Sequence, residues 1–183
     1  MTSPPYNLGI AYRTYQDKLG EDAYLSWLET LFREVARVLR PDGSIFLNLA
    51  GSSKAPLLPF KVAVRLSEFL CLQNHIVWAK AISVRDRSYG HFKPVNSPRY
   101  LNRLHEHLFH FTKSGTTALN RLAIGVPFED KANISRRKHE QDKRCRGDIW
   151  FIPYPTVQSK KGKFHHPAGF PEQLVEYCLG LHG

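Results

Sequence analysis

The sequence predicts an α/β fold, in which crossover helices connect the strands of one sheet. The first observation is that segments with the period of a helix alternate with short apolar segments typical of buried strands. The second is that these segments follow one another at the spacing of crossover connections. The third is size, since 183 residues, of which 42% are hydrophobic, suffice for one domain with its own core.

The first predicted element is an amphipathic helix over residues 21–40. Its apolar side chains recur at helical spacing, while the charged side chains lie mostly elsewhere around the helix. The predicted buried face consists of Tyr24, Leu28, Leu31, Phe32, Val35 and Leu39. Pro41, Asp42 and Gly43 then end the helix with residues typical of a turn.

Two strands and a second helix follow. Residues 44–51, SIFLNLAG, have the composition of a short buried strand closed by glycine. Residues 59–70 begin with proline, which is favoured at the first position of a helix, and predict a second helix. Residues 74–81, NHIVWAKA, predict a second strand. This order makes the opening residues a loop that follows a strand hardly represented in the sequence.

Residues 105–113, HEHLFHFTK, predict a third strand. Because side chains alternate along a strand, Leu108 and His110 are expected on one face of the sheet. Phe109 and Phe111 are then expected on the other face.

The histidines of this strand do not match a metal-binding motif. Phe109 stands where a helical His-Glu-x-x-His pattern requires its second histidine. On a strand, His105 and His107 share one face, and His110 points to the other. We therefore predict no metal site.

The charge of the chain favours a polyanionic partner. Lys and Arg number 26 against 16 Asp and Glu, which gives a formal net charge of +10. Nucleic acid is the first candidate for a surface of this charge, and an anionic membrane the second. The alternative is a protein that is basic without such a partner. The longest apolar runs are too short to span a bilayer, so we expect no membrane segment.

Much of this charge lies between residues 85 and 148. That segment holds 14 Lys and Arg against 7 Asp and Glu, so it carries +7 of the total. Its densest part, SRRKHEQDKRCRG, supplies the candidate DNA-binding residues Arg136, Arg137, Lys138 and Arg144. Aromatic side chains interleaved with the charge favour a nucleic-acid surface, because bases can stack on them while phosphates are neutralised. The alternative for this stretch is a solvated charged loop.

The three cysteines indicate a reducing compartment. Cys71, Cys145 and Cys178 are odd in number and far apart, and match neither a disulfide framework nor a zinc site. Because polar residues and prolines occupy positions 2–7, we expect no signal peptide before the first motif. We expect a cytoplasmic protein with structural cysteines.

The opening residues TSPPYN resemble motif IV of the amino-methyltransferases that act on exocyclic amines of DNA bases. The segment EVARVLRPDGSIFLNLAG resembles the helix and strand that follow this motif in the family, and GHFKPVNSPRYLNRLHEHLFHFTKSG resembles a further stretch. The segment from Ile149 to Gly183 resembles motif X, with its His-Pro-x-x-Phe-Pro core at residues 166–171. The resemblance covers nearly the whole chain, and its motifs occur in family order. It implies a Rossmann-like fold that uses S-adenosylmethionine, with an inserted basic target-recognition region.

The resemblance also implies a mechanism for the Ser3-Pro4-Pro5-Tyr6 motif. An exocyclic amine is a poor nucleophile because its lone pair is delocalised into the ring. The Ser3 side chain and the Pro4 carbonyl would accept both amine hydrogens and hold them out of the ring plane. Proline fixes φ and has no N–H that competes. Tyr6 would stack on the target base, which must be flipped out of the duplex to be reached.

Further roles follow from the same resemblance. The methionine end of S-adenosylmethionine would contact His166, Pro167, Phe170 and Pro171. The cysteines lack the Pro-Cys context of carbon-methylating relatives, so no covalent intermediate is expected. The substrate would be double-stranded DNA at a short specific sequence, in a restriction-modification or phage system.

The base that is methylated remains open at this point. Serine rather than aspartate at position 3 favours the N4 amine of cytosine, and the N6 amine of adenine is the alternative. A second alternative is a non-catalytic remnant that only binds DNA. A third is one half of a split enzyme whose second chain supplies the cofactor loop.

The order of the motifs resembles a permuted class of the family with the catalytic motif first. We assign residues 1–84 to the catalytic part, 85–148 to a strand and the basic recognition region, and 149–183 to the motif X region. The family continues with a glycine-rich Asp-Pro-Phe-x-Gly-x-Gly loop, and no such loop occurs in these 183 residues. We therefore expect a fragment that by itself binds the cofactor weakly.

Overall fold

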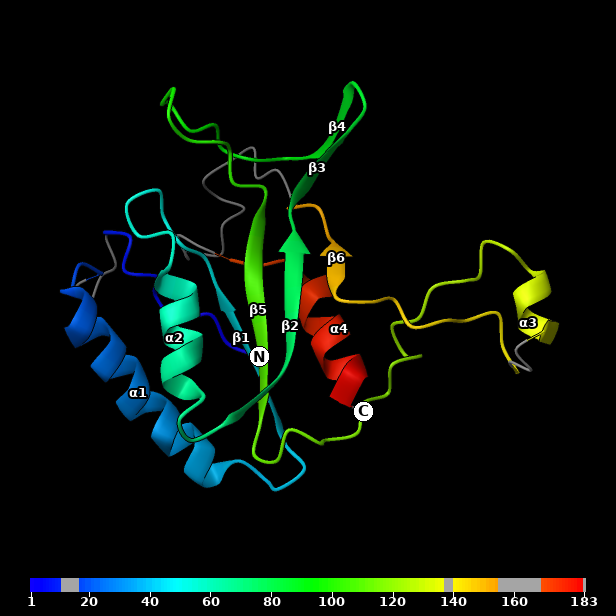
Figure 1. Cartoon of the computed structure of the whole chain (residues 1–183), viewed down its shortest axis with the longest axis horizontal. Helices are drawn as coiled ribbons and strands as arrows, with labels where there is room; N and C mark the ends of the chain where they lie inside the picture. Colours follow the sequence, from blue (N-terminus) through cyan, green and yellow to red (C-terminus); the bar gives the residue numbers. More distant parts are fainter. Residues whose placement is uncertain (11–16, 137–139, 155–168, 183) are drawn as a thin grey trace.

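The computed structural model describes residues 1–10, 17–136, 140–154 and 169–182. Its centre is a four-stranded sheet with helices on both faces, as expected for an α/β protein (Figure 1). In spatial order the strands are β1 (Ser44–Leu49), β5 (His105–Thr112), β2 (Cys71–Ala79) and β6 (Ile149–Phe151).

The direction of the strands is mixed. β5 is antiparallel to both β1 and β2, so β1 and β2 run in the same direction, and β6 is parallel to β2. The connection from β1 to β2 contains helix α2 (Leu58–Leu66), which is the predicted crossover. No helix separates β2 from β5 in the described chain, and the returning strand is inserted antiparallel between the first two. The segment 85–148 thus contributes the strand between β1 and β2.

Helices α1 (Glu21–Val38) and α2 cover one face of the sheet (Figure 1). Phe109 and Phe111 share this face, as predicted, and are buried in this layer. The predicted face of α1 was wrong at one position, because Leu31 is 42% exposed and Leu25 is buried. The buried stripe of α1 is narrower than the apolar stripe predicted from the sequence. It is also rotated toward Leu25, which lies one turn before Leu28.

Helix α4 (Glu172–His182) covers the opposite face. Leu108 is fully buried there, and the ring of His110 stacks on Phe46 with 4.5 Å between centroids. The predicted alternation along this strand is therefore confirmed. Cys178 of α4 is buried and its Sγ lies 3.7 Å from Met1 Sδ, whereas Cys71 and Cys145 are exposed.

The N-terminal residues run along the outer edge of β1. Thr2 pairs in parallel with Leu47, through hydrogen bonds from its N–H to Phe46 and from the Asn48 N–H to its carbonyl, each 2.9 Å. This pairing places Ser3 beside the carboxyl end of β1. Carboxyl ends of strands are where open α/β sheets bind their ligands.

A hairpin of β3 (Ala81–Val84) and β4 (Arg87–Gly90) projects from the carboxyl end of β2. Gly90 has φ +82°, and a Cβ there would collide with the carbonyl oxygen of Lys80, so glycine permits the close return of the hairpin. The short helix α3 (Ala132–Arg136) lies on an arm on another side of the molecule (Figure 1). No helix in the described part of the chain is long and apolar enough to cross a membrane.

Candidate active site

The loop that carries the Ser3 motif is held by a buried carboxylate. Asp17 is 3% exposed and accepts hydrogen bonds from the backbone N–H groups of Asn7, Leu8 and Ile10, at 2.8, 3.1 and 2.9 Å. The Asn7 side chain bonds both the carbonyl and the N–H of Leu19, at 2.9 and 2.7 Å. Asn7 has φ +59°, a left-handed conformation that asparagine tolerates. Asp17 and Asn7 therefore fix the chain that leaves the motif.

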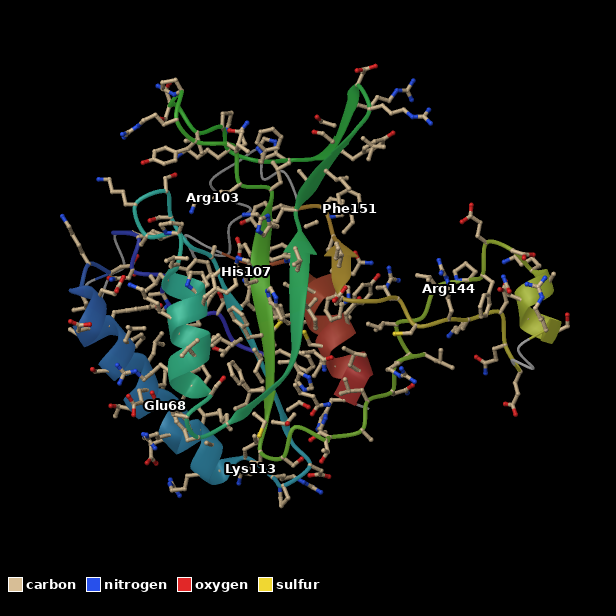
Figure 2. All side chains as sticks on the ribbon, in the orientation of Figure 1. Glu68, Arg103, His107, Lys113, Arg144 and Phe151 are labelled. Atoms are coloured by element: carbon tan, nitrogen blue, oxygen red, sulfur yellow. The ribbon has the colours of Figure 1, made fainter. Side chains whose placement is uncertain are left out.

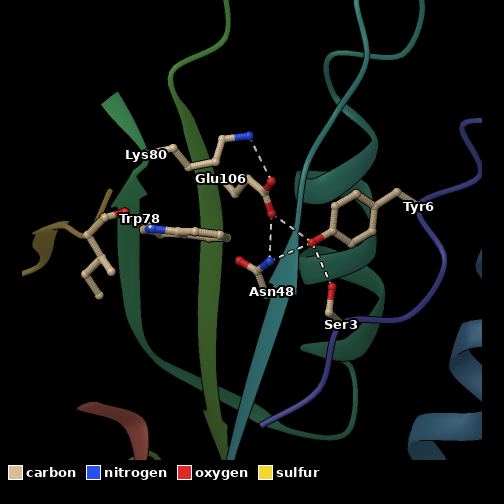
Figure 3. A network of polar contacts seen from close by, with 7 residues as sticks. Ser3, Tyr6, Asn48, Trp78, Lys80 and Glu106 are labelled. Carbon is tan, nitrogen blue, oxygen red and sulfur yellow. Dashed lines mark hydrogen bonds and ion pairs between the residues drawn. The ribbon is translucent and has the colours of Figure 1, made fainter. Parts of the chain in front are cut away.

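A network of polar contacts starts at the Ser3 hydroxyl (Figure 3). Ser3 Oγ lies 2.8 Å from Tyr6 Oη, and Tyr6 Oη donates to Glu106 Oε2 at 2.8 Å. The Asn48 side-chain amide donates to Tyr6 Oη at 2.6 Å and to Glu106 Oε2 at 2.7 Å. Lys80 Nζ completes the network with an ion pair to Glu106 Oε1 at 3.0 Å.

Adjacent strands bring these side chains together. Asn48 is on β1, Glu106 is on β5, and Lys80 directly follows β2. Asn48 is paired with Leu108, and Glu106 with Trp78, so the two polar residues lie on the same face of neighbouring strands. The sheet therefore defines the spacing of the network, and the loop adds Ser3 and Tyr6 at its edge.

The network keeps Tyr6 protonated. Burial raises the pKa of the Tyr6 phenol well above its ordinary value of 10.0, and the negative charge of Glu106 raises it further. A neutral phenol has one hydrogen to donate and can accept two. Asn48 is 1% exposed, and its Oδ1 has no hydrogen-bond partner among the described residues.

The two prolines of the motif have different surroundings. The Pro5 carbonyl accepts a hydrogen bond from Tyr24 Oη at 2.7 Å, which attaches the motif to α1. Pro4 is buried, and within the described residues no group donates to its carbonyl. The Ser3 hydroxyl and the Pro4 carbonyl are thus consecutive oxygen atoms at the edge of the sheet, and the carbonyl retains its capacity to accept.

A groove of about 310 Å³ opens on the other face of the same end of the sheet. The loop after β1 lines it with residues 51–53, and Arg103, His105 and His107 line it from the start of β5. His107 Nδ1 lies 3.0 Å from His75 Nε2. Burial lowers the pKa of His107 to about 4, and its neighbours His105 and His75 lower it further. Among the described residues, no group of three or more histidine, cysteine or acidic side chains is arranged to hold a metal ion.

The structure places two of the predicted cofactor residues. Phe170 packs, partly buried, against the core beneath α4, and the Pro171 carbonyl accepts the Leu174 N–H at 3.1 Å in the first turn of that helix. His166 and Pro167 lie outside the described residues.

Two of the four predicted DNA-binding residues, Arg136 and Arg144, lie away from the Ser3 network. Arg144 is on the arm, where its backbone pairs with Val126 (Figure 2). Arg136, at the end of α3, donates to Asn133 Oδ1 at 3.1 Å. Arg137 and Lys138 lie outside the described residues. The structure does not bring Arg136 or Arg144 together with Ser3 and Tyr6.

Residues 85–103 form a second basic segment, which we call the hairpin segment. It is exposed and contains one acidic residue, Asp86, beside Arg85, Arg87, Lys93, Arg99 and Arg103. In the described chain none of these five forms an ion pair. Arg103 lies at the end of the sheet where β5 begins (Figure 2).

The sequence analysis did not find Asn48, Lys80, Glu106 or Asp17. One signal was available, since an asparagine within the apolar run SIFLNL is unusual for a buried strand. Lys80 and Glu106 have no local signal, because their partners are distant in the sequence, and no motif marks Asp17 as the acceptor for its nearby backbone N–H groups.

The fold is that of a Rossmann-like methyltransferase. The chain matches the solved structure of the PvuII DNA methyltransferase (cytosine-N4-specific) with a TM-score of 0.65 and 17% identity, over all of this chain and 62% of that one. The DNA methylase family N6_N4_Mtase matches residues 1–182, and the chain belongs to this family.

Two curated relatives match almost the whole of this chain. The Type II methyltransferase M.HpaI of Haemophilus parainfluenzae is 43% identical over 98% of this chain and 51% of its own length. The DNA adenine methyltransferase YhdJ of Escherichia coli strain K12 is 22% identical over 96% of this chain and 57% of its own length. The chain therefore spans little more than half the length of these relatives.

Proposed function

We propose that this chain is the amine-positioning part of an S-adenosylmethionine-dependent DNA methyltransferase that acts on the N4 amine of cytosine at a specific sequence. The observation that carries the proposal is the pair of oxygen atoms on Ser3 and Pro4 at the carboxyl end of β1. Membership of the DNA methylase family supports it.

Each part of the motif has a chemical role in this proposal. Ser3 Oγ and the Pro4 carbonyl accept the two amine hydrogens and hold them out of the plane of the base, which localises the nitrogen lone pair for attack. Pro5 fixes the backbone between these oxygens and Tyr6, and its own carbonyl is held by Tyr24. The ring of Tyr6 stacks on the flipped base. When bound, S-adenosylmethionine supplies an electrophilic methyl group.

The described residues bring the motif X region close to the start of the chain. Phe170 and Met1 pack against the same core cluster, and Cys178 of α4 contacts Met1. This packing brings the start of the chain to the helix that follows residues 166–171. We propose that His166, Pro167, Phe170 and Pro171 contact the methionine end of the cofactor.

Adenine N6 is the second candidate for the methylated amine. Serine in place of aspartate supports cytosine, whereas the similarity to YhdJ, a DNA adenine methyltransferase, supports adenine. Both amines offer two hydrogens on an exocyclic nitrogen, so the Ser3 and Pro4 oxygen atoms suit either.

For the DNA we propose two basic surfaces. Arg136, Arg137, Lys138 and Arg144 are one, and the hairpin segment is the other. The described cations of both surfaces, Arg136 and Arg144 on the arm and the five of the hairpin segment, are exposed and suited to phosphates. The hairpin segment adjoins the Ser3 network through Lys80, which directly precedes β3.

A chimera tests the proposed function. Residues 1–183 replace the matching half of M.HpaI, and the purified chimera is incubated with bacterial DNA and S-adenosylmethionine. Mass spectrometry of the digested nucleosides then distinguishes N4-methylcytosine from N6-methyladenine. We expect methylation that disappears in a Ser3→Ala variant with the same melting temperature. Unmodified DNA from a folded chimera, beside an active M.HpaI, would contradict the proposal and favour a protein that only binds DNA.

A further inference from the structure

We propose that Glu106, acting through Tyr6, directs the Ser3 hydroxyl hydrogen away from the target amine, so that Ser3 Oγ can only accept. This inference rests on the proposed function. Glu106 is then a positioning residue, because it touches Tyr6 and not the substrate. The number of hydrogens available to the network in Figure 3 determines this direction.

The Tyr6 hydroxyl lies within hydrogen-bonding distance of three groups. It donates to Glu106 Oε2 at 2.8 Å and receives a hydrogen from the Asn48 amide at 2.6 Å. Its third neighbour is Ser3 Oγ at 2.8 Å. A phenol has one hydrogen, and here that hydrogen belongs to the bond with Glu106. The contact between Ser3 and Tyr6 must therefore use the Ser3 hydrogen.

Glu106 is a strong acceptor for the Tyr6 hydroxyl hydrogen. Its Oε1 is paired with Lys80 at 3.0 Å, and its Oε2 accepts from both Asn48 and Tyr6. An ionised carboxylate has no hydrogen to donate. Hydrogen bonds to such a group are short and strong. The side chains of Lys80 and Glu106 are 21% and 13% exposed, so solvent competes little for these contacts.

The Asn48 side chain fixes the direction of the network. Its two amide hydrogens go to Tyr6 and Glu106, and the residue is buried on β1. A reversal of the Ser3–Tyr6 bond would leave Glu106 Oε2 without its phenol donor. The arrangement in which Ser3 donates inward therefore satisfies every group that the network contains except Asn48 Oδ1.

The direction of the Ser3–Tyr6 hydrogen bond matters because a serine hydroxyl can act in two ways toward the amine. A hydroxyl can donate or accept a hydrogen bond. If the Ser3 hydrogen pointed toward the amine, two donor hydrogens would face and repel each other. With its own hydrogen committed to Tyr6, Ser3 Oγ presents lone pairs toward the amine. The network thus gives a serine the acceptor character of a carboxylate without placing a negative charge beside the base.

The test measures which base edge the site prefers. Two pairs of nucleosides carry an amine against a carbonyl at the exocyclic position: 2′-deoxycytidine against 2′-deoxyuridine, and 2′-deoxyadenosine against 2′-deoxyinosine. The adjacent ring nitrogen also changes in each pair, from an acceptor to an N–H donor, so the variants below identify the part of the preference that depends on Ser3. Affinities for the 183-residue chain are measured by saturation-transfer NMR without cofactor. We expect one amine nucleoside to bind about tenfold more tightly than its carbonyl partner, the effect of about one hydrogen bond.

Three variants separate direction from structure. Glu106→Leu removes the acceptor, so the Tyr6 hydrogen turns to Ser3 and the preference for the amine disappears. Tyr6→Phe keeps the ring but releases the Ser3 hydrogen, and the preference disappears again. Glu106→Gln retains the preference, because two donors, Asn48 and Tyr6, face the Oε2 position against Lys80 alone at Oε1, so the glutamine oxygen takes the Oε2 position. The control is Glu68→Leu, at an exposed glutamate beyond the end of α2 (Figure 2).

The outcomes distinguish this inference from the function on which it rests. An amine preference that survives in Glu106→Leu and Tyr6→Phe overturns the role of Glu106 and leaves the proposed function intact. Loss of the preference in Glu106→Gln also overturns it, since an oxygen acceptor then does not suffice. A wild-type chain that prefers no amine nucleoside contradicts the proposed function itself. Circular dichroism confirms the fold of each variant.

Discussion

Lys80 and Glu106 form an ion pair across two neighbouring strands, with Nζ 3.0 Å from Oε1 and both side chains largely buried. Lys80 lies between β2 and β3, at the point where the β3–β4 hairpin begins, and Glu106 is near the start of β5. This pair joins the network around Ser3 to the base of the hairpin segment, so changes there are expected to affect both.

Replacing Lys80 with methionine should destabilise the protein. The change leaves the Glu106 carboxylate largely buried without its cation, and we expect the free energy of unfolding to fall by about 2 kcal/mol, below the cost for a fully buried pair. Urea denaturation measures it. The exposed Lys113, changed to methionine, is the matched control (Figure 2). Equal midpoints for the two variants would show that solvent already screens the pair.

Replacing Asp17 with asparagine should loosen the loop that carries the Ser3 motif. The amide keeps one oxygen acceptor where the carboxylate serves three backbone N–H groups. We expect a loss of about 2 kcal/mol in unfolding free energy, since hydrogen bonds to charged groups contribute about 1.5–3 kcal/mol. Faster amide hydrogen exchange at Asn7 and Leu8 is the local readout. Asp86→Asn, on the exposed hairpin, should change neither quantity.

The stability of the protein should fall between pH 6.5 and about 4. Burial lowers the pKa of His110 from 6.5 to about 4, so in this interval the unfolded chain binds a proton that the native protein does not. Burial lowers the pKa of His107 to about 4 as well, so this residue contributes to stability with the same sign. The stabilisation is therefore present above pH 6.5 and is lost as the pH falls, by up to about 1.4 kcal/mol per pH unit for each group.

Urea denaturation at several pH values checks this dependence. His110→Gln should lower stability at pH 7.5 and flatten the slope below pH 6.5, because the titrating group is gone. His91→Gln, at an exposed histidine, should leave the slope as it is in the wild type. An unchanged slope in His110→Gln would assign the acid sensitivity to other groups.

The two basic surfaces can be compared by salt dependence. Glutamine at Arg136, Arg137, Lys138 and Arg144 should weaken DNA binding and lower the salt slope by about 1 for each lost phosphate contact. Glutamine at Arg85, Arg87, Arg99 and Arg103 tests the hairpin segment in the same assay. Arg37→Gln on α1, where Glu34 already pairs the arginine, is the control. A slope that responds only to the hairpin set would leave the arm as a solvated loop.

The sequence pattern predicted the features of the fold that depend on neighbouring residues, such as which side chains of one strand share a face. Alternation placed Leu108 and Phe109 on opposite faces of one strand, and the structure confirms it. The alternation of side chains is the same in parallel and antiparallel strands, so it did not show that β5 is antiparallel to its neighbours. Leu31 was misplaced because an apolar residue near the edge of a helical stripe can face solvent at modest cost.

The site could be predicted only where a motif was contiguous. Ser3, Pro4, Pro5 and Tyr6 are adjacent in the sequence, and their resemblance to a known motif identified them. Glu106 is separated from Tyr6 by 100 residues, and the pairing of β1 with β5 brings it within reach. A single sequence holds no record of strand register, so this contact could not be inferred from it.

The alternation along β5 also has a consequence for how the protein tolerates change. Glu106 faces the Ser3 network, while its neighbours His105 and His107 line the groove behind the sheet. A slip of one residue in the pairing of β5 would exchange carboxylate for imidazole on both sides at once. It would also turn Phe109 and Phe111 toward α4. Insertions and deletions should therefore be accepted in the loop over residues 91–104 and rejected between His105 and Thr112, so that length variation in this region stops abruptly where the strand begins.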